Sequence, residues 1–201
     1  MSNDLYYYTI EKNAIAEFKE KGSRFIAYAY PISTTDEFKK YLQQLKKEHP
    51  KAVHLCFAYR LGIDGNIFRV SDDGEPNGTA GKPILNVIDS KQLTNILIII
   101  VRYFGGTLLG VPGLINAYKS ATAMALQVVP FVKKPVEINY ELQFDYTRMN
   151  DVMMVLKHYN CTIIKQENQL FSVVKTGIQK ARLTEVLLKL NELHTVELKQ
   201  C

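Results

Sequence analysis

The chain opens with strand-like segments and then changes to a helical pattern. Strands are expected at residues 5–10, 14–20 and 24–32. A helix is expected to follow, because Thr34 and Glu37 have the spacing of a capping box and precede an apolar stripe of helical period. His49 and Pro50 are expected to end this helix, since the residue before a proline disfavours helical geometry.

The next strand, at residues 53–61, has two faces of different character. Apolar side chains occupy one face, at Val53, Leu55, Phe57, Tyr59 and Leu61. The other face is small and partly charged, with His54, Cys56, Ala58 and Arg60. This alternation has the period of two that a strand requires. We expect the first face to be core and the second to be open to solvent or to a partner.

The sequence GIDG at residues 62–65 predicts a hairpin to a second strand. Phe68 and Val70 are expected on the core side of that strand. The opposite face of the hairpin would then carry the polar side chains of both strands, namely His54, Arg60, Arg69 and Ser71. The hairpin therefore delivers the polar loop that follows it to the edge of this polar face.

A helix, a buried strand and a second helix are expected after that loop. The first helix begins at GKPILNVI, residues 81–88. The apolar run NILIIIVRYF, residues 95–104, is typical of a central strand that is covered on both faces. A helix introduced by glycine then occupies residues 109–129.

Two prolines, Pro130 and Pro135, precede a strictly alternating segment, and we place a domain boundary between residues 1–132 and 133–201. In the second domain, strands are expected near residues 136–144, 161–166, 170–176 and 195–199, and helices near 149–156 and 183–190. Thr147 is expected to cap the first of these helices. The order β-α-β-β-α-β is that of a ferredoxin-like fold. The chain is therefore expected to be α+β with two domains.

The composition is that of an ordinary soluble globular protein, with 47% hydrophobic and 22% charged residues in 201. Residues 1–10 do not resemble a secretory signal, and the longest aliphatic run, residues 96–101, is too short to cross a bilayer. Cys56, Cys161 and Cys201 are scattered, which supports neither a disulfide framework nor a zinc site. We expect a cytoplasmic protein with no membrane partner. The net charge of +5 is only weak evidence for nucleic acid.

The loop SDDGEPNGTAGKP, residues 71–83, contains the first candidate site. Asp72, Asp73 and Glu75 could supply oxygen ligands to a divalent metal ion. The same carboxylates could instead bond backbone amides and cap the next helix, or recognise a partner. The calcium-loop pattern is incomplete after Glu75, which favours the second interpretation.

The end of this loop is a candidate anion site. Gly78 and Gly81 precede Lys82 at the start of a helix, where free backbone amides and the helix dipole attract negative charge. Pro76 and Pro83 replace residues that a nucleotide phosphate loop requires, so nucleotide hydrolysis is disfavoured.

A second glycine-rich turn follows the buried strand. Arg102, Tyr103, Gly105 and Gly106 stand between that strand and the next helix, a position that commonly holds ligands. In the alternative interpretation, the two glycines serve only a tight turn and close packing.

The motifs contain no catalytic constellation. The sequence has no nucleophile elbow and no metal-ligand pairing of histidines. His54 and Cys56 stand two apart on a strand, about 7 Å between Cα atoms, which is too far for a direct dyad. We therefore expect His54 to pack on its strand, and we expect neither an enzyme activity nor a cofactor, with a metal ion at the acidic loop as the alternative.

The segments HLCFAYR, SDDGEPNGTAGKP and VRYFGGTLLGVPGL together resemble the YigZ/IMPACT family, and the resemblance covers the whole chain. It implies an N-terminal domain with the fold of the second domain of ribosomal protein S5, and a ferredoxin-like C-terminal domain similar to the last domain of elongation factor G. Eukaryotic members are implied to be translational regulators, which compete for the ribosome-bound activator of a kinase that senses uncharged tRNA. The two-domain chain resembles bacterial members, for which a nucleic-acid-binding or translation-associated role is implied.

The sequence thus predicts a non-catalytic protein that binds RNA or ribosomes through its N-terminal domain, without DNA sequence specificity. The expected phosphate-reading surface combines basic side chains with glycine amides, at Arg60, Arg69, Lys82, Arg102, Gly78, Gly81, Gly105 and Gly106. Tyr103 and Phe104 could stack a base. Two alternatives remain, a protein-binding regulator and a metal-dependent hydrolase that uses Asp72, Asp73 and Glu75.

Overall fold

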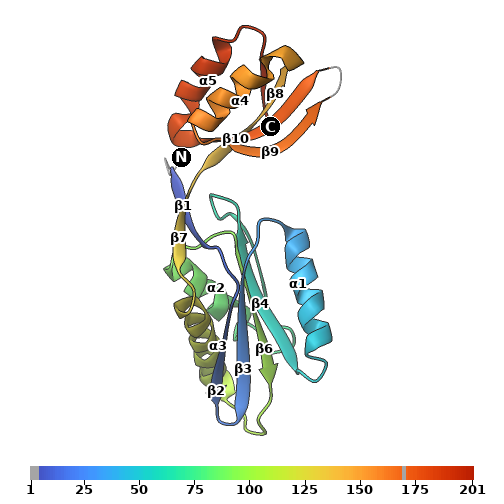
Figure 1. Ribbon diagram of the computed structural model, residues 1–201. Helices are drawn as coiled ribbons and strands as arrows, with labels where there is room; N and C mark the ends of the chain where they lie inside the picture. Colours follow the sequence, from blue (N-terminus) through green and yellow to red (C-terminus); the bar gives the residue numbers. More distant parts are fainter. Residues whose placement is uncertain (1–4, 169–170) are drawn as a thin grey trace. The chain divides into compact units, whose positions relative to one another are not determined.

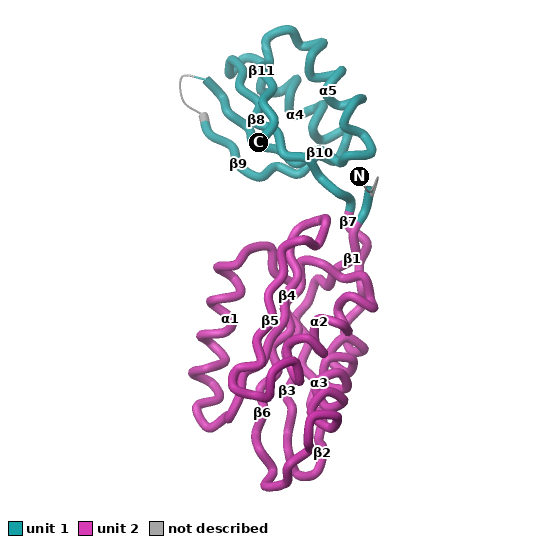
Figure 2. The backbone as a smooth tube through the Cα atoms, turned by 180° about the vertical axis from the view of Figure 1, so that it is seen from behind, with its two compact units in different colours: residues 1–6, 135–201 teal, residues 7–134 magenta. Residues whose placement is uncertain are grey.

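The computed structural model describes residues 5–168 and 171–201 (Figure 1). The chain divides into two compact units, residues 7–134 and residues 1–6 with 135–201 (Figure 2). The division after residue 134 lies two residues beyond the boundary expected from the sequence. Each unit has its own sheet and its own hydrophobic core. The two-domain α+β organisation is confirmed.

The larger unit is built on a five-stranded antiparallel sheet of order β2-β3-β6-β4-β5. Its strands are β2 (Ala14–Glu20), β3 (Ser23–Pro31), β4 (His54–Leu61), β5 (Ile67–Ser71) and β6 (Ile96–Tyr103). The central strand β6 has the apolar sequence ILIIIV and is buried on both faces, as its composition predicted.

Helices cover both faces of this sheet. Helix α1 (Thr35–Glu48) lies on one face, and helices α2 (Gly81–Ser90) and α3 (Gly110–Gln127) lie on the other (Figure 1). The core under α1 is rich in aromatic side chains, whereas the core under α2 and α3 includes small side chains of the strands, Ala27, Ala29, Cys56 and Ala58. Small strand residues allow a helix to approach the sheet closely, so two helices fit on this side.

The expectation that the second face of β4 is open was wrong. Cys56 and Ala58 on that face are completely buried beneath α2 and α3. A small, partly polar strand face is compatible with exposure, but small residues are equally suited to contact with a helix. The strand is therefore core on both sides.

The face assignment of the hairpin was also wrong. The sequence GIDG predicts a turn of four residues, but Leu61 pairs with Ile67, so residues 62–66 all belong to the turn. Arg69 stands opposite Tyr59 instead of beside Arg60, because a register shift of one residue moves every side chain to the other face. In β5, Phe68 and Val70 are exposed.

The smaller unit is a four-stranded sheet of order β11-β8-β10-β9. Its elements are β8 (Glu137–Phe144), α4 (Met149–His158), β9 (Thr162–Asn168), β10 (Ser172–Gln179), α5 (Leu183–Asn191) and β11 (Glu197–Gln200). The predicted β-α-β-β-α-β order is confirmed. Thr147 is not the cap, because the Asp145 carboxylate accepts hydrogen bonds from the Thr147 amide and hydroxyl at 2.9 and 2.7 Å.

One small sheet was only half anticipated. Strand β1 (Tyr6–Ile10) agrees with the predicted strand at residues 5–10, but the sequence predicted no strand for its partner β7 (Phe131–Pro135), which lies at the domain boundary. Strand β7 is flanked by proline and carries only two apolar residues, so its own pattern is weak and the pairing with β1 defines it. None of the described helices is long and apolar enough to span a membrane.

The capping box of α1 is present as predicted and can be tested. Thr34 Oγ1 accepts a hydrogen bond from the Glu37 amide at 3.3 Å, and Glu37 Oε2 accepts one from the Thr34 amide at 3.0 Å. Thr34→Ala is expected to lower the free energy of unfolding by about 1 kcal/mol in urea titrations, because a helix amide loses its partner. Ser33→Ala is the matched control and should have little effect, because the Ser33 hydroxyl makes no hydrogen bond with the described residues.

Candidate functional site

A pocket of about 340 Å³ lies where β4 begins and β6 ends, beside the start of α3. Three polar side chains contribute to it, those of His54, Glu75 and Arg102. Its other walls are largely apolar, and its mouth is surrounded by Val53, Phe104, Leu108 and Val111, all of them exposed. We call these four residues the apolar rim. A broader hollow on α4 and α5 of the smaller unit contains none of the residues that the sequence analysis identified.

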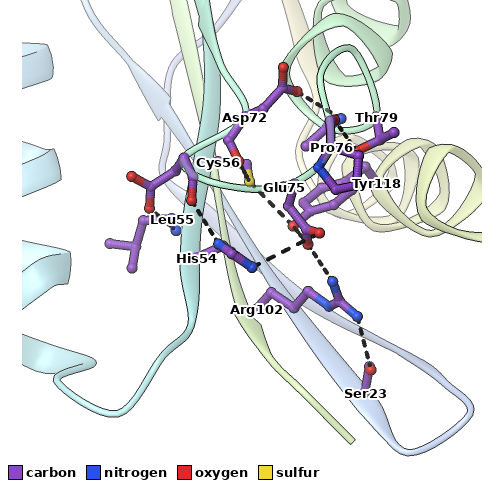
Figure 3. Close-up of polar contacts among 12 residues, drawn as sticks. Ser23, His54, Leu55, Cys56, Asp72, Glu75, Pro76, Thr79, Arg102 and Tyr118 are labelled. Carbon is purple, nitrogen blue, oxygen red and sulfur yellow. Dashed lines mark hydrogen bonds and ion pairs between the residues drawn. The ribbon is translucent and has the colours of Figure 1, made fainter. Parts of the chain in front are cut away.

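An ion pair between Glu75 and Arg102 forms the floor of the pocket (Figure 3). Arg102 Nη1 donates a hydrogen bond to Glu75 Oε1 at 2.5 Å, and the hydroxyl of Tyr118 donates to the same oxygen at 2.8 Å. Only 6% of the Arg102 side chain and 3% of the Glu75 side chain are exposed. Each of the two charges compensates the desolvation cost of the other, and either one alone would be buried without compensation.

Strand pairing brings His54 next to this ion pair. His54 stands directly opposite Arg102 in the β4–β6 ladder. Its Nδ1 lies 2.7 Å from the carbonyl oxygen of Asp73, and since that oxygen can only accept, Nδ1 carries the proton. In the uncharged ring, Nε2 is then the acceptor, and it lies 4.0 Å from Glu75 Oε2 (Figure 3).

Behind the ion pair, Cys56 and Tyr118 form a fully buried contact. The Cys56 Sγ lies 3.2 Å from the Tyr118 hydroxyl and 3.0 Å from the carbonyl oxygen of Asp72. Burial is the main reason that the pKa values of both groups are raised well above their usual range. Tyr118 therefore stays protonated and donates to Glu75, and Cys56 stays a thiol.

The other side of Arg102 is held by aromatic rings and by a turn. Its guanidinium carbon lies 5.3 Å from the centre of the Phe25 ring and 5.7 Å from that of Phe104. Arg102 Nη2 is 3.5 Å from the hydroxyl oxygen of Ser23, which also accepts a hydrogen bond from the Gly105 amide. The side chain is thus positioned from β3, from β6 and from the loop before α3.

The three carboxylates of the acidic loop do not meet. Asp72 accepts hydrogen bonds from the amides of Gly78, Ala80 and Gly81 at 2.8–3.0 Å. Asp73 accepts one from the Leu55 amide at 2.7 Å, and Glu75 bonds Arg102 and Tyr118. Among the described residues, no three His, Cys, Asp or Glu side chains lie together as the ligands of a metal ion would. The loop uses its carboxylates to organise itself and the start of α2.

The predicted anion site at the end of this loop is filled from within. The amides of Gly78 and Gly81 are bonded to the Asp72 carboxylate, which occupies the place expected for a phosphate. Gly81 also packs so closely that a β-carbon would lie 2.7 Å from the Ser71 nitrogen. Lys82 is exposed and makes no ion pair with the described residues.

The second glycine turn serves packing. A β-carbon at Gly105 would lie 1.9 Å from the carbonyl carbon of Gly22, in the β2–β3 turn, so only glycine fits there. Gly106 has a φ of +84°, which other residues rarely adopt. Of the two interpretations that the sequence left open, the geometry supports close packing.

The basic and aromatic residues predicted to form one surface are not brought together. Arg60 makes two hydrogen bonds to Asp89, at 2.7 and 2.8 Å. Arg69 lies on the opposite face of the sheet, 6.0 Å from the centre of the Phe57 ring. Tyr103 points to the α1 side and bonds the ring of His49 at 2.8 Å. Arg102 is buried, so the expected phosphate-reading surface does not form.

Two parts of the site were missed from the sequence. Tyr118 stands 43 positions from Glu75, and the sequence pattern indicates only one more apolar position of α3 there. The exposed Leu108 and Val111 read as ordinary residues of a turn and a helix start. No local sequence signal identifies the role of Tyr118 or of the two exposed apolar residues. A tyrosine on a buried helix face does indicate, however, that its hydroxyl needs a hydrogen-bond partner.

The buried ion pair leads to the first prediction for this site. Glu75→Gln is expected to lower the free energy of unfolding by about 3–5 kcal/mol in urea titrations, because it leaves the Arg102 charge buried and unpaired. Glu75→Gln with Arg102→Met should recover part of that loss. Glu17→Gln, which removes a partly exposed partner of Arg24, is the control and should change stability little. A small effect of Glu75→Gln would contradict the role given to the pair.

The three thiols should differ in their reaction with a thiol-specific chromogenic reagent. Cys201 is exposed and should react first. Burial raises the pKa of Cys161 to about 11, so its thiolate fraction and its rate should rise about tenfold for each pH unit below that value. Cys56, buried with a raised pKa, should react only after unfolding. Cys161→Ser and Cys201→Ser variants assign the phases, and rapid reaction of Cys56 would show that the packing behind Glu75 is open.

Comparison with known proteins identifies a family. Residues 21–126, more than half of the chain, match the family described as the Impact N-terminal domain. The chain is 36% identical over 162 residues to an IMPACT family member of Haemophilus influenzae, with 79% of each chain covered. It is 33% identical over 172 residues to IMPACT family member YigZ of Escherichia coli, covering 85% of this chain and 84% of that protein. A solved structure titled as that of a hypothetical protein has a TM-score of 0.79 and 29% identity, with 97% of each chain covered. The chain therefore belongs to the IMPACT family.

Proposed function

We propose that this chain is a translation-associated regulator that binds a protein partner through the apolar rim of the pocket. The observation that carries the proposal is the exposure of the rim. Leu108 is 84% exposed, and Val53, Phe104 and Val111 are each about half exposed around one cavity. Exposed apolar side chains that gather around a concave surface are typical of protein interaction sites. Single exposed apolar residues would carry no such meaning.

The charges at the pocket favour a protein partner over an RNA backbone at this surface. Contacts to phosphates require accessible cations. Arg60 is paired with Asp89 and Arg102 with Glu75, and the rim itself contains no basic residue. Lys82 is exposed, but the amides beside it are already bonded to Asp72. RNA contact is therefore the weaker alternative.

The translation part of the proposal rests on the family. The chain belongs to the IMPACT family, and the resemblance set out from the sequence implies translational regulation for its eukaryotic members. Since the family implies a role in translation and the contact surface is apolar, the proposed partner is a protein component of the translation machinery. The proposal assigns no catalytic step to the pocket.

The test is co-sedimentation of the full chain with ribosomal particles from extracts of its own cells, in sucrose gradients at low and high salt. Wild-type protein is expected to migrate with the particles at both salt concentrations, because an apolar contact is screened little by ions. Leu108→Asp is expected to remain at the top of the gradient. Since Leu108 is almost fully exposed, this change should not alter the fold.

Two variants serve as controls in the same gradients. Leu188→Asp places the same change at an exposed leucine of α5 and should migrate like the wild type. Lys82→Ala should also migrate like the wild type. Migration that is lost at high salt and in Lys82→Ala, but kept in Leu108→Asp, would replace the proposal with RNA contact. If wild-type protein does not migrate with the ribosomal particles at low salt or at high salt, the association with translation is contradicted.

A further inference from the structure

The polar floor of the pocket has hydrogen-bonding capacity that the described part of the chain leaves unused. Glu75 Oε1 accepts two hydrogen bonds, but Oε2 has no described donor within bonding distance. In the uncharged ring with the proton on Nδ1, His54 Nε2 is likewise an acceptor without a donor, 4.0 Å from that oxygen. Among the described residues, only two of the five guanidinium N–H groups of Arg102 make hydrogen bonds. The floor therefore offers a pair of acceptors beside a donor.

The spacing of the two acceptors indicates the group that would fill them. A nitrogen can lie about 2.9 Å from both atoms at once, because this is an ordinary N–H···O distance and the acceptors are only 4.0 Å apart. Such a nitrogen must carry at least two hydrogens. This condition excludes a main-chain amide, which has one, and leaves three protein groups, namely a primary amide, an ammonium group and the terminal nitrogen of a guanidinium group.

The charge of the floor decides among these groups. The Glu75 carboxylate is already balanced by Arg102, and an uncharged His54 ring adds no charge. An ammonium or guanidinium group would therefore bring an uncompensated positive charge next to the buried guanidinium of Arg102, which is costly. A carboxylate would face Glu75 Oε2. A primary amide is neutral, and its carbonyl oxygen can accept from the free N–H groups of Arg102.

We propose that the pocket binds the side-chain carboxamide of a glutamine or asparagine from the partner protein. The –NH₂ group donates to Glu75 Oε2 and to His54 Nε2, and the carbonyl accepts from Arg102. Leu108, Val111 and the rest of the apolar rim cover the stem and the neighbouring residues of the partner. This inference rests on the proposed function, since it names the chemistry of the partner at the same surface.

The test uses capped tripeptides in which leucine flanks a central glutamine, glutamate, lysine or methionine. Binding to the isotopically labelled full chain is followed by amide chemical shifts. The glutamine peptide is expected to bind at least tenfold more tightly than the other three, because only it satisfies the acceptors and the donor without adding charge. The largest shifts are expected at residues 53–55 and 104–111.

A variant tests the assignment on the side of the protein. His54→Leu removes one acceptor and introduces an apolar side chain of similar size. This variant is expected to reduce the preference for glutamine over methionine at least fivefold. His158→Leu, on α4 of the other unit, is the control and should leave that preference unchanged. Because the peptide series is measured on wild-type protein, the proposal remains testable if His54→Leu is unstable.

The outcomes separate this inference from the proposed function. Equal binding of all four peptides at the rim would overturn the carboxamide assignment and leave the apolar contact in place. If the lysine or the glutamate peptide binds most tightly, the floor selects a charged group. This result would also overturn the carboxamide assignment. Absence of binding by any peptide, together with co-sedimentation that Leu108→Asp abolishes, would overturn the carboxamide and keep the proposed function.

Discussion

The buried ion pair between Glu75 and Arg102 is the interaction on which the architecture of the site depends. A carboxylate and a guanidinium that are both more than nine-tenths buried cannot exist singly, so the loop that carries Glu75 must close onto the end of β6. Tyr118 from α3 and Ser23 from the start of β3 complete the coordination of the two charges. One ion pair thus joins two strands, a loop and a helix that are far apart in the sequence.

In the acidic loop, side chains that could bind a metal ion or a partner bond to backbone amides of the same chain instead. Asp72 binds the amides at the start of α2 in the way that a phosphate would, and Asp73 binds an amide of β4. These bonds rigidify the loop and place Asp73 so that its carbonyl oxygen orients His54. The chemistry that looked like a ligand site in the sequence instead prepares the wall of the pocket beside it.

The pocket combines a polar floor with an apolar mouth, and the two parts have different consequences. In the floor, the charges of Glu75 and Arg102 balance each other, and hydrogen-bonding atoms of both side chains have no described partner. The mouth exposes apolar side chains, among them Leu108, to solvent, which costs free energy that a bound partner would recover. The proposed binding of a protein segment rests on these two features together.

The sequence by itself determined the elements and most of their order. The capping box at Thr34 and Glu37, the apolar run of β6 and the β-α-β-β-α-β order were confirmed, because each depends on residues that are close together in the chain. Family resemblance was likewise carried by contiguous segments. Only the tertiary structure decided which charges are free. One additional turn residue moved Arg69 to the other face, and Arg102 found its partner 27 positions away. Strand register and long-range pairing are set by packing between segments, so the pattern of any single segment cannot specify them.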